Sequence, residues 1–402
     1  MRTVSELCGF LPLETSVLER YETLAAKFAA GEASDALKEI FKLKDQGDRN
    51  LALRFDLTVP FSRFIAMNPN LKMPFKRYEI GPVFRDGPIK LGRTREFWQM
   101  DIDTAGTSSM LADAEILSMV DAVFKELQLD VIIKVNNRKI LNGILEQSEI
   151  KDKEVVILSI DKLNKIGKEG VTKELLTKGC TQQQIATLFQ IIDLNISLEE
   201  LKNKITNKEG IEGLTELEEL FSYLKIMNIT TVSFDVTLAR GLAYYTGPVF
   251  EAYLKKGAIT SSLAGGGRYD DLIGNYLGGA KKIPAVGISF GLVPIIQTMK
   301  ERKELLKKSP TKVYVIPIST LTESLSLVQN LRTNKISADI DLTGKGISKN
   351  LDYANSYSIP YVIFLGEDEL KKKKYKLKDM NTGEENLLTL TALKKKLKLA
   401  VN

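Results

Sequence analysis

Two arginines, Arg85 and Arg93, stand at the two ends of a polar loop between two strand-like segments. The second segment carries Gln99, Asp101 and Asp103, and alternate residues of a strand project from the same face. A planar guanidinium binds phosphate through paired hydrogen bonds, so the two arginines could clamp a polyphosphate while the carboxylates receive a cation or an amine. A salt-bridged surface hairpin would carry the same residues, so both interpretations stay open at this point.

A second cluster combines Arg240 with Tyr244 and Tyr245. The glycine-rich run AGGGR follows at 264–268, and such small residues permit a close approach of the backbone. The tyrosines could contact a ligand or pack in a core, and this cluster alone does not decide between the two roles.

The sequence of 402 residues contains no histidine. A chain without imidazole cannot form a Ser-His-Asp or Cys-His nucleophile pair or an HExxH zinc site. The phosphate-binding patterns GxxxxGK[ST] and GxGxxG are also missing, so any bound nucleotide must be held by arginine side chains. Cys8 and Cys180 are far apart, which excludes a disulfide framework and a paired zinc spacing, and no protein-held metal site is expected.

Composition and charge describe an ordinary globular chain. Hydrophobic residues make up 44% and charged residues 27%, and the length predicts two or three domains. No long apolar segment and no secretory signal are visible, which predicts a cytoplasmic protein without a membrane partner. From Lys300 onward there are 20 basic and 12 acidic residues, typical either of a polyanion-binding module or of a solvated lysine-rich surface.

The periodicity of apolar residues predicts the elements that must position these clusters. In order they are a hairpin (strand 75–84, loop 85–95, strand 96–103), a helix at 111–127, a strand at 131–135, charge-rich helices from 139 to about 228, β-like alternation at 233–254, a glycine-rich sheet segment at 264–267, and a strand at 285–290 leading into a helix at 291–308. Ser309-Pro310 predicts a linker. Beyond it, strands alternate with helices and end in a hairpin and a lysine-rich helix, which is typical of an α/β domain.

Five segments stand in a fixed order: RNLALRFDLTVPFSRF, FKRYEIGPVFRDGPIKLGRTREFWQMDID, LARGLAYYTGPVFE, AGGGRYDDL and IPAVGISFGL. In this order they closely resemble the histidyl-tRNA synthetases, a family of class II aminoacyl-tRNA synthetases. The segments SIDKLNKIG and LTELEELFSYLKIMNI look like the archaeal and eukaryotic branch of that family. The segments VYVIPI, IDLTGKGISKNLDYAN, IPYVIFLGEDEL and LKDMNTGE look like its anticodon-binding module.

The resemblance implies an α+β fold, in which a class II catalytic domain with an antiparallel sheet carries a helical insertion and is followed by a C-terminal α/β anticodon-binding domain. The implied divisions are 1–138 and 229–308 for the two parts of the catalytic domain, 139–228 for the helical insertion and 311–402 for the anticodon-binding domain. The implied substrates and partners are histidine, ATP with Mg²⁺, tRNA(His) and a second copy of the chain in a homodimer.

The implied reaction joins histidine to ATP. The α-carboxylate of histidine attacks the α-phosphate, pyrophosphate leaves, and the aminoacyl group then passes to the 3′ end of the tRNA. Because that carboxylate is already ionised, the reaction needs positioning and charge stabilisation rather than a protein base. A chain without histidine is compatible with this chemistry.

By motif match, the resemblance assigns the ATP site to arginines and one threonine. Arg85 would contact the α-phosphate, Arg93 the outer phosphates, and Thr58 the adenylate region. Arg240 would stabilise the reacting carboxylate and phosphate, so that Arg240 and Arg85 would be the catalytic residues.

The same match assigns the histidine site. The substrate amine would be held by Asp56 and Gln99, and the imidazole by Asp103 with Tyr245. A neutral isostere of histidine would leave these buried polar groups without hydrogen-bond partners, so the pocket would discriminate against it. The pocket wall would be shaped by Tyr244, Gly266 and Tyr269.

The chain departs from the family pattern at three motif positions. Val293 and Pro294 follow Gly291-Leu292, where class II enzymes usually place an arginine that stacks on adenine. Gly87 stands where the motif 2 loop commonly has an acidic residue, although Asp86 is adjacent. Ala243 replaces an aspartate often found before the tyrosine pair.

The N-terminal motif is short as well. The chain begins inside the long helix expected before GFLPLET, and Ser16 stands where a proline is expected. This pattern indicates either a misplaced start codon or an altered dimer interface.

Two functions fit this resemblance: an active histidine–tRNA ligase, and a non-catalytic protein that binds tRNA or histidine as a sensor or regulatory subunit. Residues 311–402 argue for a tRNA partner, because such regulatory subunits usually lack the anticodon-binding module. The enzyme is favoured because substrate-binding residues are retained, namely Arg85, Arg93, Gln99, Arg240 and Tyr245.

Aromatic and basic residues near the C-terminus could contact RNA. Tyr353, Tyr357 and Tyr361 lie beside Lys345 and Lys349 in the sequence, and could stack on and neutralise unpaired anticodon bases. The alternative is that these tyrosines pack a helix onto the sheet, and at least one of them is expected in the core.

Overall fold

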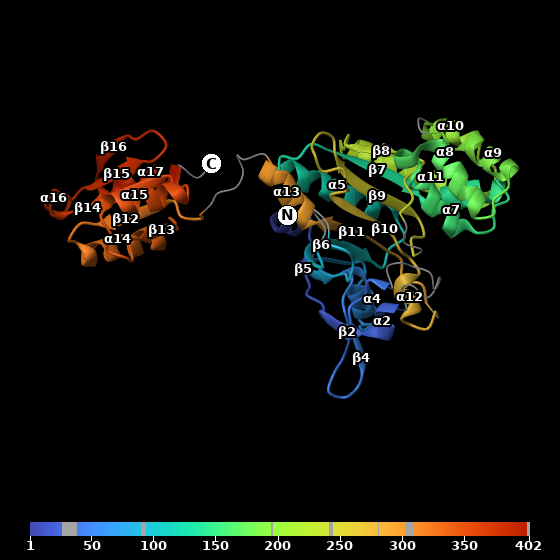
Figure 1. The fold of residues 1–402 in the computed structure, drawn as a ribbon, viewed down its shortest axis with the longest axis horizontal. Helices are drawn as coiled ribbons and strands as arrows, with labels where there is room; N and C mark the ends of the chain where they lie inside the picture. The colour runs from blue at the N-terminus through green and yellow to red at the C-terminus, as the bar shows by residue number, and fades with distance from the viewer. Residues whose placement is uncertain are drawn as a thin grey trace. The chain divides into compact units, whose positions relative to one another are not determined.

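The computed structural model describes residues 1–25, 38–89, 94–193, 196–240, 244–279, 281–301 and 309–399. The chain divides into two compact units, Met1–Thr298 and Met299–Asn402 (Figure 1). Within the described residues, no helix is both long enough and apolar enough to cross a bilayer.

A mixed sheet forms the centre of the first unit. Its eight strands over the described residues are, in spatial order, β1 (Leu11–Pro12), β5 (Phe75–Phe84), β6 (Glu96–Ala105), β11 (Ala285–Gly291), β10 (Ala264–Arg268), β9 (Pro248–Leu254), β7 (Val131–Asn137) and β8 (Val232–Phe234). The pairs β1–β5 and β7–β8 are parallel, and the inner pairs are antiparallel as expected from the sequence. Each edge strand pairs parallel because a long crossover, not a hairpin, connects it to its neighbour.

Strand β6 alternates polar and apolar residues, and this alternation gives the sheet two different faces. Gln99, Asp101 and Asp103 lie on one face, whereas Met100 and Ile102 are fully buried on the other. The cross-strand register continues the polar face over the neighbouring strands. One row of directly paired residues is Glu79, Asp101, Ser289, Gly265, Glu251 and Lys134, and the next is Arg77, Asp103, Gly287 and Gly267.

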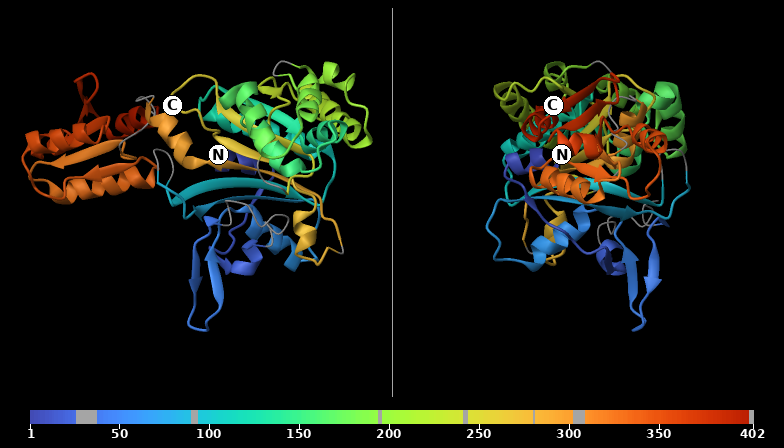
Figure 2. Two further views of the ribbon diagram at one scale, coloured as in Figure 1. Left: turned by 45° about the vertical axis from the view of Figure 1, so that its right-hand side comes forward. Right: turned by 90° about the vertical axis from the view of Figure 1, so that its left-hand side faces the viewer.

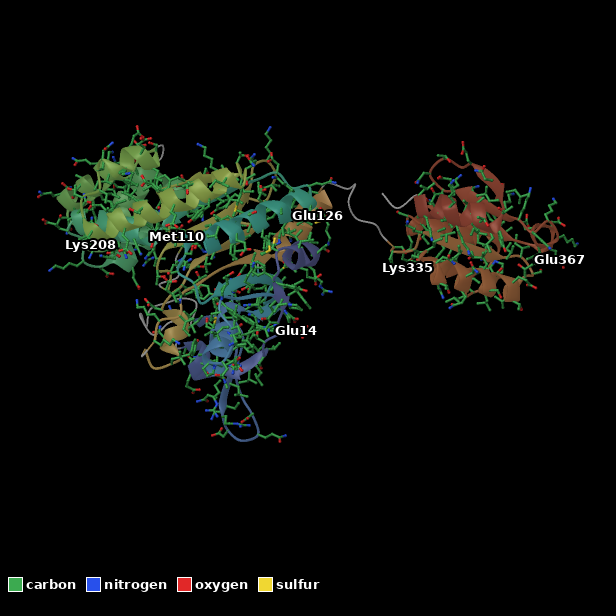
Figure 3. All side chains as sticks on the ribbon, turned by 180° about the vertical axis from the view of Figure 1, so that it is seen from behind. Glu14, Met110, Glu126, Lys208, Lys335 and Glu367 are labelled. Carbon is green, nitrogen blue, oxygen red and sulfur yellow. The ribbon has the colours of Figure 1, made fainter. Side chains whose placement is uncertain are left out.

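Helices cover both faces of this sheet (Figure 2). On the apolar face, α5 (Met110–Glu126) contacts β6 and β11, and α11 (Lys208–Ile226) contacts β7 and β9. Met110 and Lys208, at the first turns of these helices, are labelled in Figure 3. On the polar face, α4 (Thr58–Met67) contacts β6 and packs against α12 (Leu272–Asn275). Asp101 and Asp103 of β6 are therefore buried on that face rather than exposed to water.

The remaining N-terminal elements are short. They are α1 (Arg2–Leu7), α2 (Tyr21–Ala25) and a three-stranded sheet of β2 (Leu18–Arg20), β4 (Asn50–Leu53) and β3 (Lys42–Lys44). Helix α2 packs on β4 and α4, which ties this small sheet to the helix above the polar face.

Between Arg138 and Ile226 the described chain is helical, as the charge-rich pattern predicts. The helices before α11 are α6 (Arg138–Gln147), α7 (Lys153–Ile160), α8 (Leu163–Thr177), α9 (Gln182–Ile191) and α10 (Leu198–Lys202). Capping boxes begin α9 at Thr181 and α10 at Ser197. Because α11 packs on both α6 and α5, this segment belongs to the same compact unit as the sheet, and its separate status as an insertion domain stays a prediction.

Two expected elements differ from the structure. The β-like alternation expected over 233–254 yields β8 and β9, but the described residues between them form a loop that carries Arg240. The backbone of that loop is fixed by hydrogen bonds to the side chains of Asp235 and Asn136 instead of a strand ladder. The helix expected at 291–308 is α13 (Leu292–Glu301), and residues 302–308 lie outside the described part of the chain.

The second unit alternates strands and helices as predicted. Its elements are β12 (Val313–Pro317), α14 (Leu321–Thr333), β13 (Ala338–Ile340), α15 (Ile347–Ser356), β14 (Tyr361–Leu365), α16 (Glu367–Lys371), β15 (Tyr375–Asp379), β16 (Glu385–Leu388) and α17 (Leu390–Leu399). The strand order is β13-β12-β14-β15-β16, with a parallel first half and an antiparallel hairpin. Tyr361 packs on the core, whereas Tyr353 on α15 and Tyr357, directly after this helix, are exposed.

Candidate functional site

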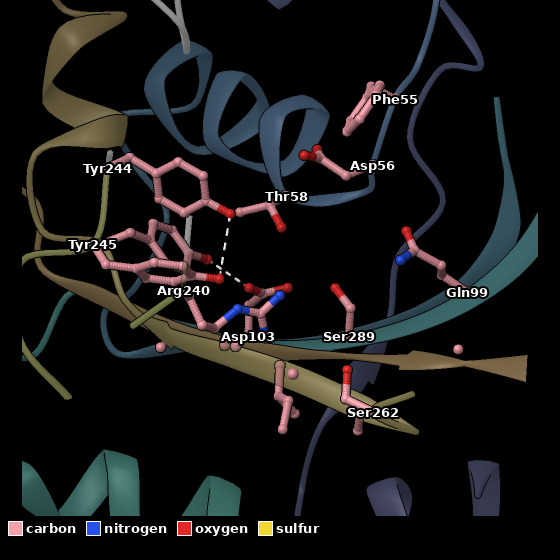
Figure 4. Close-up of a pocket in the computed structure, with 18 of the residues that line it drawn as sticks. Phe55, Asp56, Thr58, Gln99, Asp103, Arg240, Tyr244, Tyr245, Ser262 and Ser289 are labelled. Carbon is pink, nitrogen blue, oxygen red and sulfur yellow. Dashed lines mark hydrogen bonds between the residues drawn. The ribbon is translucent and has the colours of Figure 1, made fainter. Parts of the chain in front are cut away.

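A cavity of about 230 Å³ lies on the polar face of the large sheet, beneath α4 (Figure 4). The sequence-predicted residues that line it are Asp56, Thr58, Arg85, Gln99, Asp103, Arg240, Tyr244, Tyr245, Gly266 and Tyr269. The structure thus brings together both clusters found in the sequence. Arg93 lies outside the described residues.

Glycines on two central strands open the floor of the cavity. A Cβ on Gly287 would collide with Oδ1 of Asp103, and a Cβ on Gly265 would collide with the guanidinium of Arg240. Both glycines occupy polar-face positions in the register of β10 and β11. The small residues therefore make room for the functional side chains and for a ligand above them.

Three buried ion pairs link Arg54, Glu79, Arg77 and Asp103 in a chain, which we call the charge ladder. Nη1 of Arg54 lies 2.8 Å from Oε1 of Glu79, Nη1 of Arg77 lies 2.9 Å from Oε2 of Glu79, and Nη2 of Arg77 lies 2.8 Å from Oδ2 of Asp103. The hydroxyl of Tyr269 donates to Oδ1 of Asp103 at 2.5 Å. Burial alone would lower the pKa of Arg77, but Asp103 and Glu79 outweigh burial and raise that pKa. Arg77 therefore stays charged and holds the carboxylate of Asp103 in place.

Asp101 lies beside this ladder on the same face of β6. Burial, together with the neighbouring charge of Asp103, raises the pKa of Asp101 to about 8. The hydroxyl of Thr58 donates to Oδ2 of Asp101 at 3.4 Å, and Ser289 also hydrogen-bonds to Asp101 and opposes the rise. Asp101 therefore joins Thr58 on α4 to Ser289 on β11 through hydrogen bonds, a role that the sequence motifs did not assign.

The start of α4 brings Asp56 and Thr58 over the sheet. Oδ1 of Asp56 accepts a hydrogen bond from the backbone N–H of Val59 at 3.0 Å, so this carboxylate sits at the positive end of the helix. Asp56 and Thr58 are buried, with 7% and 8% exposure.

Two tyrosines with tilted, closely packed rings close one end of the cavity, opposite Gln99 in the view of Figure 4. The rings of Tyr244 and Tyr245 are 4.6 Å apart between centroids, and their hydroxyls are 3.5 Å apart. Tyr269 meets the edge of Tyr244 at 6.3 Å. Burial, and then the charge of Asp56, raise the pKa of Tyr244, so its phenol stays neutral and can donate a hydrogen bond.

Arg85 enters the cavity from the end of β5 with its guanidinium against aromatic rings. Its Cζ lies 4.2 Å from the ring centroid of Phe55 and 5.0 Å from that of Phe97. Its Nε also donates to the backbone carbonyl of Phe55 at 3.5 Å, and these contacts fix the plane of the guanidinium. Where an arginine is usual, Pro294 instead packs in the first turn of α13, with its Cγ 3.0 Å from the Cβ position of Gly291.

Several lining residues were missed from the sequence. They are Phe55, Ser262, Leu263, Gly287, Ile288 and Ser289, whereas Ala264, Gly265 and Gly267 belong to the glycine-rich run that the sequence did single out. Gly287, Ser289 and Gly291 alternate along β11, so the period of two could have placed them on one face. Nothing local indicates that this face, rather than the other, meets Asp103.

Three buried polar atoms of the described cavity-lining residues have no hydrogen-bond partner among the described residues. One of them, Oδ2 of Asp103, is compensated by its ion pair with Arg77, and the other two are not. Oε1 of Gln99 is an unpaired acceptor, and Nη1 of Arg240 is an unpaired donor. Buried polar groups are rarely left unpaired in a folded protein, because each one costs about 1–3 kcal/mol. An acceptor and a cationic donor match the amine and the carboxylate of a free amino acid.

Comparison with known proteins agrees with this geometry over both units. A family model described as histidyl-tRNA synthetase matches residues 1–295, and a model described as an anticodon binding domain matches residues 312–399. The chain is 45% identical to histidine–tRNA ligase 1 of Bacillus cereus, with 97% of this chain and 90% of that protein covered. It is 39% identical to histidine–tRNA ligase of Clostridium tetani, with 96% and 90% covered.

A solved structure gives the same result. The crystal structure of histidyl-tRNA synthetase from Nostoc sp. PCC 7120 matches with a TM-score of 0.86 at 29% identity, covering 100% of this chain and 94% of that one. These relatives are bacterial, so the expected archaeal and eukaryotic branch is not supported. That expectation depended on segments in α7, α8 and α11, where the packing of amphipathic helices decides residue types in any lineage. The chain belongs to the histidyl-tRNA synthetase family.

Proposed function

We propose that the cavity beneath α4 is the site at which this histidine–tRNA ligase activates histidine with ATP. The carboxylate of histidine attacks the α-phosphorus, the bond to pyrophosphate breaks, and histidyl-adenylate forms. The 3′-terminal ribose hydroxyl of tRNA(His) then takes the histidyl group and AMP leaves. The observation that carries the proposal is the pair of unpartnered buried atoms, Oε1 of Gln99 and Nη1 of Arg240, in one cavity.

The proposed histidine site occupies the end of the cavity lined by the tyrosines. Asp56 and Gln99 would accept hydrogen bonds from the substrate amine, and Asp103 with Tyr245 would pair with the two ring nitrogens. Arg77 and Tyr269 keep the carboxylate of Asp103 in place, which supports this role. Tyr244 would form the wall beside the imidazole.

The proposed ATP site uses cationic side chains in place of a glycine-rich loop. Arg85 would contact the α-phosphate, Arg93 the outer phosphates, and Thr58 the adenylate. Arg240 would stabilise the negative charge that develops between the carboxylate and the α-phosphate. The stacking of Arg85 on Phe55 and the orphan Nη1 of Arg240 support these assignments.

The reaction of this family uses ATP and requires a divalent metal ion, and we propose Mg²⁺. In the described part of the chain, no group of three histidine, cysteine, aspartate or glutamate side chains is arranged to hold a metal. We propose Mg²⁺ as the ion that accompanies ATP, since this ion is usually bound through substrate phosphates with few protein ligands. The residue roles above do not depend on a protein ligand to it.

The second unit is proposed as the part that binds the anticodon of tRNA(His). A cavity of about 620 Å³ beside α15 is lined by Tyr314, Tyr353, Lys345 and Lys349. The ring centroids of Tyr314 and Tyr353 are 5.2 Å apart, and those of Tyr353 and Tyr357 are 4.8 Å apart. Such a ladder next to two cations could stack an unpaired base and neutralise its phosphate.

Three further proposals depend on family resemblance. They are a homodimer, a cytoplasmic location, and the divisions at 1–138, 139–228, 229–308 and 311–402. Sedimentation of the purified chain would test the dimer, and a monomer at micromolar concentration would contradict it.

The experiment for the main proposal is histidine-dependent exchange of pyrophosphate into ATP by the purified chain, with the other amino acids as controls. Exchange with histidine alone is expected, and would show that Pro294 is tolerated near the position where class II enzymes usually have an arginine. Arg240→Ala should lower exchange by about 10²–10³-fold, because it removes a charge used in the transition state. No exchange by the wild type, with tRNA still bound, would favour a synthetase-like regulatory protein instead.

A further inference from the structure

The guanidinium of Arg240 lies directly over the backbone of Gly265 on β10. A Cβ at Gly265 would collide with Nη1 of Arg240 and would lie 2.8 Å from its Cζ. The side chain is 19% exposed, and Nη1 donates to no described residue. Because a guanidinium is planar, the contacts of its Nε edge decide which way its Nη1 edge faces.

The acidic neighbour of that Nε edge is Glu251 on β9. Glu251 is the direct cross-strand partner of Gly265, and its Oε1 lies 3.7 Å from Nε of Arg240. The carboxylate is 17% exposed, so solvent screens the pair only in part. The Tyr253 hydroxyl, two residues further along the same face of β9, donates a hydrogen bond to Oε2 of Glu251.

The loop that leads to Arg240 is also fixed by the junction between α7 and α8. Nδ2 of Asn164 donates to Oγ1 of Thr237 at 2.9 Å. Burial raises the pKa of Asp161 in that junction, the charge of Glu251 adds to the rise, and a hydrogen bond from the Ala239 backbone opposes it. Asn164 and Asp161 therefore hold the loop before Arg240. The side chain of Arg240 is held separately, by Glu251 on β9.

We propose that Glu251 is a positioning residue for Arg240. The carboxylate of Glu251 attracts the Nε edge of the guanidinium, and the hydroxyl of Tyr253 fixes the orientation of that carboxylate. The Nη1 edge then faces the cavity without a hydrogen-bond partner among the described residues. The inference depends on the proposed function, in which Arg240 meets the developing charge on the carboxylate and α-phosphate. Glu251 itself is not among the residues that line the cavity.

The first test compares Glu251→Gln with the wild type in pyrophosphate exchange. The amide keeps the shape of the side chain but removes the charge that holds Arg240. We expect kcat to fall about 100-fold, as for a small misplacement of a catalytic group, with KM for ATP changed less than about threefold. Tyr253→Phe should give a smaller fall in kcat of the same kind.

Glu216→Gln is the matched control. Glu216 is 19% exposed and pairs with Lys139 at 2.6 Å in the same compact unit, but it does not line the cavity. Its variant should keep the kcat of the wild type. Equal losses of kcat in the two variants would overturn the proposal, because the effect would then come from general destabilisation.

A double-mutant cycle tests whether Glu251 acts through Arg240. The readout is the Kd of a non-hydrolysable histidyl-sulfamoyl adenylate, which remains measurable in variants that have lost activity. If Glu251 acts through Arg240, Glu251→Gln weakens binding in the wild type but adds little in the Arg240→Ala background. Fully additive losses would overturn the proposal.

Crystal structures of the wild type and Glu251→Gln separate this inference from the proposed function. We expect the guanidinium of Arg240 to leave its place over Gly265 in the variant, whether or not the wild type shows exchange. An unmoved guanidinium would refute the positioning role even if exchange is active. An inactive wild type with a displaced guanidinium in the variant would refute the proposed function alone.

Discussion

Arg77 and Asp103 form an ion pair beneath the cavity, with Nη2 2.8 Å from Oδ2 and both side chains at most 2% exposed. Glu79 closes the other side of Arg77, so one guanidinium joins two carboxylates in the interior of the unit. Removal of one member of such a group leaves an uncompensated buried charge. The carboxylate proposed to select histidine therefore depends on a residue that does not line the cavity.

Arg77→Met should lower the free energy of unfolding by about 3–5 kcal/mol, because Glu79 and Asp103 lose their shared cation. Urea unfolding followed by the fluorescence of Trp98, the single tryptophan and a residue of β6, would measure the loss in this unit. Lys44→Met removes an exposed pair with Asp48 and should change stability little. Equal stability of Arg77→Met and the wild type would contradict a structural role for the ladder.

Asp103→Asn should raise KM for histidine at least about tenfold in the exchange assay, since a charged hydrogen-bond acceptor for the imidazole is lost. KM for ATP should change much less, because the proposed ATP contacts come from Arg85 and Arg240. Tyr269→Phe, which removes the donor to Asp103, should give a smaller change in the same direction. A matching rise in both KM values would refute the assignment of Asp103 to histidine.

The raised pKa of Asp101 predicts a specific pH dependence of stability. Its ordinary value is 3.8 and its value in the fold is about 8, so between these values the folded chain holds a proton that the unfolded chain has released. The contribution of Asp101 to the free energy of unfolding is therefore most favourable at low pH. It falls by up to about 1.4 kcal/mol per pH unit as the pH rises from 3.8 to about 8. Asp101→Asn should remove that slope.

Unfolding free energies of the wild type and Asp101→Asn between pH 5 and pH 8 would measure the effect. The free energy of unfolding of the wild type should fall steadily relative to that of Asp101→Asn as the pH rises over this range. Two parallel profiles would show that Asp101 is ionised in the folded state at neutral pH.

Gly287→Ala should weaken histidine binding, because the added Cβ would meet the carboxylate of Asp103 and lie 2.8 Å from the carbonyl oxygen of Ile102. Calorimetric titration with histidine should show a Kd at least about tenfold weaker, the size expected when one charged hydrogen bond is lost. Gly47→Ala is a control, since its nearest neighbours would be 3.5 Å and 3.6 Å away. Unchanged affinity in Gly287→Ala would exclude Asp103 from the histidine site.

Tyr353→Ala should weaken tRNA binding by about 1–3 kcal/mol if its ring stacks on an unpaired base. Pyrophosphate exchange, which needs no tRNA, should stay at the level of the wild type. Tyr375→Phe keeps a ring that packs against the core of the same unit, and should not alter tRNA affinity. Loss of exchange in Tyr353→Ala would mean that the substitution disturbs more than RNA contact.

Local sequence pattern was sufficient for most elements near the site. The strand at 75–84 matches β5, the helix at 111–127 is α5 to within one residue at each end, and the strand at 131–135 lies within β7. Alternation in WQMDID also placed Gln99, Asp101 and Asp103 on one face of β6 correctly. These features follow from periods of 2 and 3.6 residues, which depend on neighbours along the chain.

Family motifs indicated which residues meet, but not how they are held. Ser289, Gly265 and Glu251 line up with Asp101 only through the register of β11, β10 and β9. The loop before Arg240 resembled a strand in its alternation, yet side-chain hydrogen bonds to Asn136 and Asp235 fix it instead.

The sequence by itself determined the family, the α+β architecture and most of the polar residues that line the cavity, although Ser262 and Ser289 were missed. Tertiary structure alone decided that Arg77 supports Asp103, that burial raises the pKa of Asp101, and that Glu251 faces Arg240. The hydrogen bond between Tyr269 and Asp103 joins residues 166 positions apart. Contacts of that kind depend on strand register and on burial, which set both the distances between charges and the cost of ionising them, and neither is encoded in local periodicity.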